Sequence, residues 1–90
     1  MNMLPARLRE MRERAKLTQV QVARAVGVES ANAISMYERG KRKPDPETLL
    51  RFARLYDTTS DYLLGLTDDP RSLVNRIDDA TMEDVELRVG

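Results

Sequence analysis

The chain has 90 residues and a mass of 10.3 kDa, with 15 basic and 15 acidic side chains, which fits one small domain. It contains neither cysteine nor histidine, which excludes disulfides, thiolate nucleophiles and catalysis or metal binding by imidazole. Its few aromatic residues leave Leu, Val, Ile, Met and Ala to build the core, a composition that favours packed helices. No apolar run approaches the roughly 20 residues of a membrane span, and the N-terminus does not resemble an export signal, so we expect a cytoplasmic location.

The neutral total hides an uneven distribution of charge. Residues up to Tyr56 carry a net charge of +6, whereas residues from Asp57 onward carry −6. This division points to a polyanionic partner for the first part and to a different role for the second. Ordinary solvated helix faces are the alternative interpretation until a motif decides between the two.

The spacing of apolar residues predicts a first helix near the N-terminus. Leu4, Leu8 and Met11 share one helical stripe, and Pro5 fits the first turn. We expect this helix to end near Lys16, because the capping residue of the next helix follows almost at once.

Two short helices should follow, joined by a turn that contains glycine. Thr18 is a good N-cap for a second helix over residues 19–26, and Gly27 can adopt the left-handed conformation that closes it. A third helix should begin at residue 30 or 31 and end at Arg39. The residues expected to face the core are Val22, Ala23, Val26, Ile34 and Tyr37. This is the pattern of a helix-turn-helix.

A fourth and a fifth helix complete the predicted domain. Asp45 as N-cap and Pro46 at the first helical position mark the start of the fourth helix. Its expected buried residues are Leu49, Leu50, Phe52, Ala53 and Tyr56. Ser60 should cap a short fifth helix over residues 61–64, closed by Gly65, with Leu63 and Leu64 sealing the core. We therefore predict an all-α fold of five helices in a domain of residues 1–66.

Residues 67–90 should form a short acidic C-terminal extension. Asp69 followed by Pro70 can start another helix, and residues 81–89 fit a helix and a strand about equally well. A single strand in this place would need a second copy of the molecule to pair with. Either interpretation makes the extension a candidate dimerisation element.

Several spaced motifs resemble the phage-repressor (Cro/C1-type, XRE-like) helix-turn-helix family. The matching segments cover about residues 4–65. They are Leu17-Thr18-Gln19-Val20-Gln21-Val22-Ala23, Gly27-Val28, the run from Ile34 to Asp45, and Asp61-Tyr62-Leu63-Leu64-Gly65. The resemblance implies a lambda-repressor-like domain whose third helix lies in the DNA major groove, with two subunits on a palindromic operator. Ile34 lies seven residues after Gly27, where the family usually has six, so the turn is longer or the third helix starts earlier.

Candidate DNA contacts fall into two groups. The candidates for base contacts are Ser30, Ala31, Asn32, Ser35 and Met36, with Ser30 alternatively acting as a helix cap. Asn32 is the most informative, because its amide can pair with adenine N6 and N7; its alternatives are a second cap or a solvated surface residue. The candidates for phosphate contacts are Thr18, Gln19, Arg39, Lys41, Arg42 and Lys43. Glu29 would be repelled by phosphates, so we expect it to stabilise the start of the third helix.

The family resemblance also implies a structural ion pair between Arg12 and Glu38. Together these features predict a homodimeric, sequence-specific regulator of transcription that binds double-stranded DNA, most simply a repressor of the phage or prophage type. The alternative is an antitoxin-like or protein-interaction module whose acidic tail binds a partner protein.

An enzyme is the third and weakest interpretation. The only acidic clusters are Asp68-Asp69, Asp78-Asp79 and Glu83-Asp84, and neighbouring acids in one segment do not converge on a cation. No nucleophile, base or phosphate-binding glycine loop accompanies them. We therefore expect no catalytic residue, no metal and no cofactor.

Overall fold

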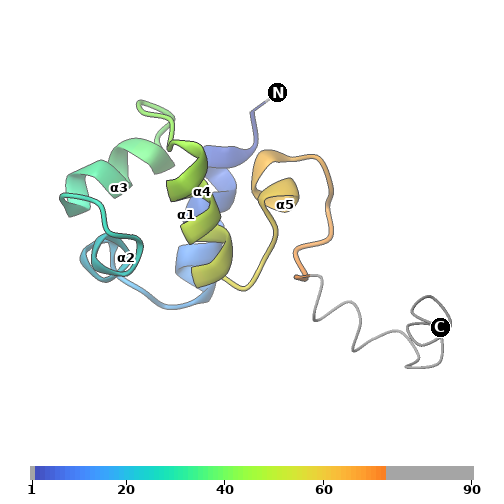
Figure 1. The fold of residues 1–90 in the computed structure, drawn as a ribbon, viewed down its shortest axis with the longest axis horizontal. Coiled ribbons are helices and arrows are strands. Elements are labelled where there is room, and N and C mark those ends of the chain that lie inside the picture. The colour runs from blue at the N-terminus through green and yellow to red at the C-terminus, as the bar shows by residue number, and fades with distance from the viewer. Residues whose placement is uncertain (1, 73–90) are drawn as a thin grey trace, which may run out of the picture.

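The computed structural model describes residues 2–72, and this part of the chain contains five α-helices (Figure 1). Their bounds are Leu4–Arg14 for α1, Gln19–Val26 for α2, Ala31–Glu38 for α3, Pro46–Leu55 for α4 and Ser60–Leu64 for α5. No strand occurs between residues 2 and 72. The predicted all-α fold of five helices is confirmed, while the helix or strand expected over residues 81–89 lies outside the described residues.

Short polar side chains set the starts of these helices. The Thr18 hydroxyl accepts from the Gln21 backbone, and the Gln21 side chain accepts from the Thr18 backbone, so α2 starts with a capping box. The side chain of Asp45 caps α4 as predicted. The cap of α5 is Thr59 rather than the predicted Ser60, because α5 begins one residue earlier than expected. Three adjacent hydroxyl residues, Thr58, Thr59 and Ser60, lie at the start of α5, and their sequence alone does not distinguish which one caps it.

The helices enclose one apolar core. Its fully buried side chains are Leu8, Val22, Val26, Ile34, Phe52 and Leu63. Phe52 packs edge-on against Tyr37 at 5.8 Å between ring centroids and stacks on Tyr56 at 6.1 Å. The expected burial of Leu50 and Leu64 is wrong, since they are 47% and 41% exposed. Phe52 and Ala53 of α4 and Tyr56 at its C-cap form the inward stripe, and Leu50 lies outside this stripe.

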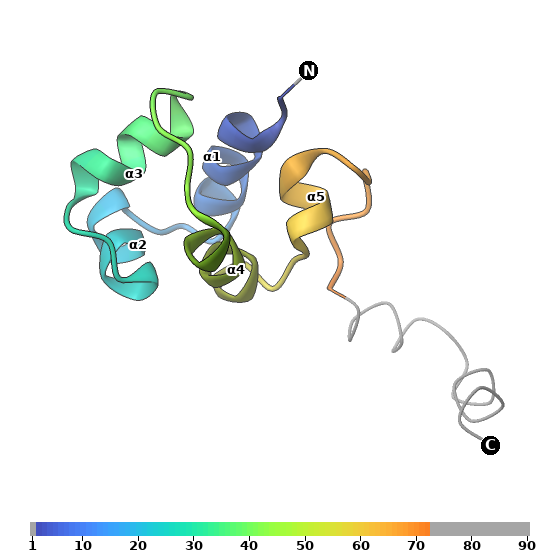
Figure 2. The same cartoon turned by 45° about the horizontal axis from the view of Figure 1, so that its top comes forward.

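The arrangement places the helix-turn-helix at one end of the described molecule. In Figures 1 and 2, α2 and α3 lie together at one end, α5 lies at the other, and α1 and α4 lie between them. The outer side of α3 is therefore free of the other helices.

None of the helices within residues 2–72 is both long and apolar enough to cross a bilayer.

The segment after α5 is fastened to α1 by a buried arginine. Arg7 Nη1 donates to the backbone oxygens of Tyr62 and Thr67, each at 2.6 Å, and Nη2 donates to Asp68 at 2.7 Å. The same guanidinium lies 4.1 Å from the centroid of the Tyr62 ring. The Thr58 hydroxyl also donates to the backbone oxygen of Pro70. Residues 67–70 thus pack against the helical domain.

Candidate nucleic-acid interface

Gly27 fixes the turn between α2 and α3. Its φ of 74° lies in the left-handed region, and its amide donates to the Ala23 carbonyl at 3.0 Å. A Cβ at this position would lie 3.0 Å from Nη1 of Arg51, which itself donates to the Val26 carbonyl. Because the backbone conformation and the close approach both favour glycine, this position holds α3 in a defined orientation on α2.

The two faces of α3 differ sharply. Ala33, Ile34 and Tyr37 are buried and attach the helix to the core. The other face carries four of the candidate base contacts, namely Ala31, Asn32, Ser35 and Met36, all of them at least partly exposed. α3 therefore presents a row of small and polar side chains away from the protein.

Asn32 is the most accessible polar group of this row. The side chain is exposed, and its contact within the protein is a weak one, from Nδ2 to the Met36 sulfur at 3.7 Å. Such an amide retains a free acceptor and donor for another molecule, and this pair of groups matches adenine N6 and N7.

The start of α3 differs from the expectation for Glu29. Ser30 is the N-cap, because its hydroxyl accepts from the Ala33 backbone at 3.3 Å, and the helix begins at Ala31. The Glu29 carboxylate instead bonds to Nη1 of Arg42 in the loop after α3. The candidate base contact Ser30 is thus engaged as a cap, the alternative role predicted for it, and the Glu29 carboxylate pairs with Arg42.

The candidate phosphate contacts lie near the two ends of the helix-turn-helix, and some of them already have side-chain partners within the protein. Gln19 donates to Glu38 at 3.3 Å, and Arg39 donates to the Ser35 hydroxyl at 3.2 Å. The Thr18 hydroxyl serves the capping box of α2. Lys41 and Lys43 are exposed, and neither forms an ion pair with a residue in the described part of the chain.

Arg12 and Glu38 tie α1, α2 and α3 together. Arg12 Nε donates to Oε2 of Glu38 at 2.7 Å and Nη2 donates to Oε1 at 3.0 Å, while Nη1 donates to the Leu17 carbonyl at 3.1 Å. The hydrogen bond to Glu38 raises the pKa of Arg12 above its usual value, although burial opposes this shift. The pair is a structural link at the point where the helix-turn-helix meets α1.

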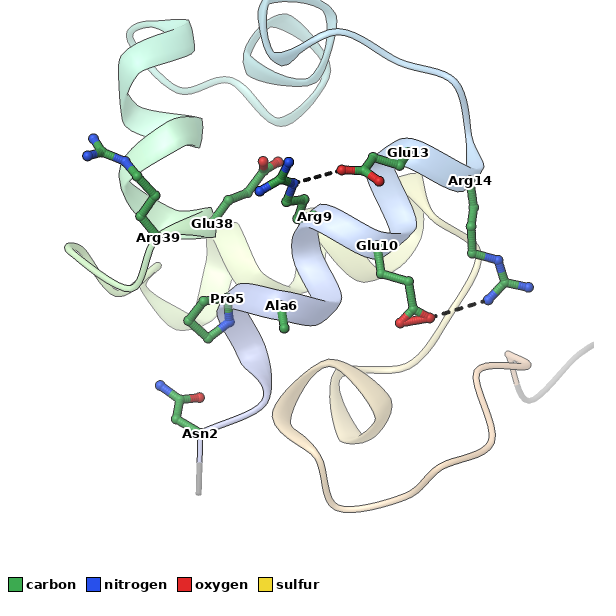
Figure 3. Close-up of a pocket in the computed structure, with 9 residues that line it drawn as sticks. All are labelled: Asn2, Pro5, Ala6, Arg9, Glu10, Glu13, Arg14, Glu38 and Arg39. Atoms are coloured by element: carbon green, nitrogen blue, oxygen red, sulfur yellow. Dashed lines mark hydrogen bonds and ion pairs between the residues drawn. The ribbon is translucent and has the colours of Figure 1, made fainter.

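Two hollows lie beside this link, and both are lined by paired charges. The larger one, about 840 Å³, runs along the exposed side of α1 to the end of α3 (Figure 3). On the α1 side of this hollow, Arg9 pairs with Glu13 and Arg14 pairs with Glu10. The smaller one, about 210 Å³, lies between α1, α2 and α3 and includes Gln19 and Arg39 in its lining. Within residues 2–72 no group of three or more acidic residues gathers as a metal site. The guanidinium groups of Arg9, Arg12 and Arg14 that line the two hollows are thus already paired with carboxylates of the protein.

The comparison with protein families decides the classification. A family model described as a helix-turn-helix domain matches residues 4–64. The chain belongs to this helix-turn-helix family. Its resemblance to the phage repressors is confirmed by a crystal structure of the P22 c2 repressor protein in complex with synthetic operator 9T. That structure superposes with a TM-score of 0.67 at 34% identity and covers 71% of this chain and 96% of the repressor chain.

Curated relatives of this helix-turn-helix protein include two from Bacillus subtilis (strain 168). The HTH-type transcriptional regulator YobD is 44% identical over 70 residues, which are 78% of this chain and 62% of YobD. The HTH-type transcriptional regulator ImmR is 44% identical over 62 residues, which are 69% of this chain and 48% of ImmR. This chain therefore spans between about half and just under two thirds of the length of these relatives.

Sequence reasoning missed two features of this helix-turn-helix protein. The ion pair between Glu29 and Arg42 joins residues 13 positions apart on either side of α3, a separation with no periodic signal. The burial of Arg7 on the inner side of α1 was also missed. An available signal was its position, since Arg7 lies three residues after Leu4 and four before Met11, on the apolar stripe of the helix.

Proposed function

We propose that this chain is a sequence-specific regulator of transcription that binds double-stranded DNA, and specifically a repressor of the phage or prophage type. The observation that carries this proposal is the outward face of α3, where Asn32 and its neighbours point away from the core on a scaffold shared with an operator-bound repressor. An α-helix fits the major groove of B-form DNA, and each base pair presents a distinct pattern of donors and acceptors there.

The α3 residues supply the sequence-reading contacts in this proposal. The Asn32 amide pairs with an adenine, and Met36 or Ala31 contacts a thymine methyl group. Ser35 lies on the same outward face and offers a hydroxyl that can donate and accept. Ser30 caps α3 in the free protein and lies at the end of the helix that we propose to approach the bases.

The basic groups around α3 supply the contacts that hold the protein in register. The start of α2 offers backbone amides and the Gln19 side chain, and positive helix ends favour anions. Lys41 and Lys43 lie in the loop that follows α3 and extend the contact along the phosphates. Phosphate contacts carry affinity and orientation but no sequence information directly.

The proposed functional unit is a homodimer on a palindromic operator. One recognition helix contacts too few base pairs to single out one site in a genome, whereas two related by a twofold axis read two half-sites one helical turn apart. Residues 67–90 are the proposed dimerisation element, and residues 1–66 the proposed DNA-binding domain.

Selection of duplexes from a random pool by the full chain tests this proposal. We expect enrichment of an inverted repeat whose half-sites have a spacing of about 10 base pairs or a multiple of it. Ultracentrifugation of the chain with the selected duplex should give two chains per duplex. A pool that remains random, with no retention even in dilute salt, would overturn the DNA-binding function. Enrichment of a single half-site would overturn the homodimer.

A further inference from the structure

Glu29 and Arg42 form a bridge across the two loops that flank α3. Glu29 lies in the turn before the helix and Arg42 in the loop after it, and Arg42 Nη1 donates to Oε1 of Glu29. The side chains remain 63% and 43% exposed. The same guanidinium lies 5.2 Å from the centroid of the Tyr37 ring. Arg42 is thus held beside the recognition helix while it stays accessible to solvent.

This bridge neutralises one of the cations expected to contact DNA. The hydrogen bond from Arg42, together with one from its own backbone, lowers the pKa of Glu29. The bond to Glu29 in turn raises the pKa of Arg42, so both groups are charged at neutral pH. Lys41 and Lys43 on either side form no ion pair within residues 2–72. Arg42 therefore presents a weaker positive field than its two neighbours.

We propose that Glu29 competes with DNA phosphate for Arg42 and thereby limits the affinity of this protein for DNA of any sequence. This inference rests on the proposed function. In the free protein the Glu29 carboxylate holds the guanidinium, and on a duplex Arg42 exchanges that carboxylate for a phosphate oxygen. Glu29 is then left without its partner, close to the negatively charged phosphates of the DNA. Because phosphate contacts carry no direct sequence information, the loss of affinity applies to operator and non-operator duplexes alike.

The exchange is chemically reasonable for three reasons. Exposed ion pairs are weak, so breaking this one costs little. A guanidinium binds a phosphate through two parallel hydrogen bonds, whereas one bond is present between Nη1 and Glu29. Ser30 caps α3, so the helix start does not depend on the Glu29 carboxylate.

The first experiment compares the wild-type chain with Glu29→Gln on a duplex of random sequence, by fluorescence anisotropy over a range of salt concentrations. Glutamine retains the shape of the side chain and removes its charge. We expect Glu29→Gln to bind about two- to fivefold more tightly, the range that an exposed ion pair contributes. The slope of log affinity against log salt should steepen by up to about one.

A charge-matched control separates this local effect from a change in net charge. Asp61→Asn removes one negative charge from α5, which Figure 1 places at the opposite end of the described molecule from α3. Physiological salt screens the electric field of such a distant charge at α3, so we expect the affinity for DNA to be unchanged. Thermal unfolding of both variants checks that their folds are intact.

A second arm asks whether Glu29 acts through Arg42. In an Arg42→Ala background, Glu29→Gln should lose most of its gain in affinity. An equal gain in both backgrounds would overturn the competition, because Glu29 would then act by direct repulsion of phosphates. Unchanged or weaker binding of Glu29→Gln alone would also overturn it. Failure of the wild-type chain to bind any duplex would overturn the proposed function itself, so the two failures are distinguishable.

Discussion

Arg12 on α1 neutralises Glu38 at the end of α3, where the carboxylate side chain is only 4% exposed. Gln19 at the start of α2 donates to the same carboxylate. The relative positions of three helices therefore depend on one buried charge and the groups that satisfy it. Removing one partner of a buried pair leaves the other charge without compensation, which costs much more than the pair itself contributes.

We predict that Arg12→Ala lowers the free energy of unfolding by about 3 kcal/mol, because Glu38 stays buried without its partner. The double variant Arg12→Ala with Glu38→Gln should recover part of this loss. Urea unfolding followed by circular dichroism measures both. The control is Arg9→Ala, whose ion pair with Glu13 is exposed and contributes less than about 1 kcal/mol. Equal losses for Arg12→Ala and Arg9→Ala would contradict the structural role of the buried pair.

Tyr56 contributes a buried hydroxyl that has no hydrogen-bond partner within the described residues. Burial raises the pKa of this hydroxyl far above its usual value of 10.0, and the negative charge of Glu38 acts in the same direction. We predict that Tyr56→Phe keeps or slightly increases stability at pH 8, because an unsatisfied polar group is removed without a cavity. By contrast, Tyr62→Phe loses the bonds from its hydroxyl to Glu10 and should be destabilised by about 1 kcal/mol.

The same pKa shift predicts a loss of stability in alkaline solution. The pKa of Tyr56 is higher in the folded state than in the unfolded state, so above pH 10.0 the unfolded state loses this proton while the folded state keeps it. The free energy of unfolding is therefore unaffected by this group below pH 10 and falls as the pH rises above that value. Each pH unit beyond this value should cost about 1.4 kcal/mol. Urea unfolding between neutral and strongly alkaline pH should show a smaller decline for Tyr56→Phe than for the wild type. Parallel declines in the two proteins would show that Tyr56 does not titrate on unfolding.

The Arg7 contacts predict that residues 67 and 68 stabilise the helical domain. A chain cut after Ser72 retains the Thr67 carbonyl and the Asp68 carboxylate that Arg7 binds, whereas a chain cut after Leu66 loses both. We predict that the first is the more stable of the two. The second should be destabilised by about 1–3 kcal/mol, because a buried guanidinium loses hydrogen bonds. Thermal unfolding of the two truncated chains distinguishes these outcomes, and equal stability would show that residues 67–72 contribute nothing to the domain.

The helix boundaries followed from the sequence wherever a capping residue was unambiguous. Thr18, Gly27 and Asp45 occupy the cap positions predicted for them, since side-chain caps and left-handed glycines act over three or four residues. Thr59 was missed because adjacent hydroxyl residues offer equivalent caps, so local sequence does not identify the helix start. Tertiary packing makes that choice.

The charged side chains of the interface were harder to predict than the helices that carry them. The outward position of Asn32 follows from the helical period, because Ile34 and Tyr37 must face the core. The partner of Arg42 does not, because Glu29 approaches it only once α3 is folded between the two loops. The sequence therefore predicts the fold and the outward face of α3, whereas only the structure shows which basic side chains are paired with a carboxylate.

The last prediction separates base reading from phosphate binding. Asn32→Ala removes an exposed amide from the outward face of α3, so it should relax preference at one position of each half-site and cost about 1–3 kcal/mol on the selected duplex. Lys43→Ala removes an exposed cation from the loop after α3, so it should weaken binding to all duplexes and reduce the salt slope by about one. Binding of both variants to the selected duplex, to its single-base variants and to a random duplex is measured over a range of salt. If the two substitutions change affinity and salt dependence in the same way, α3 does not read the bases.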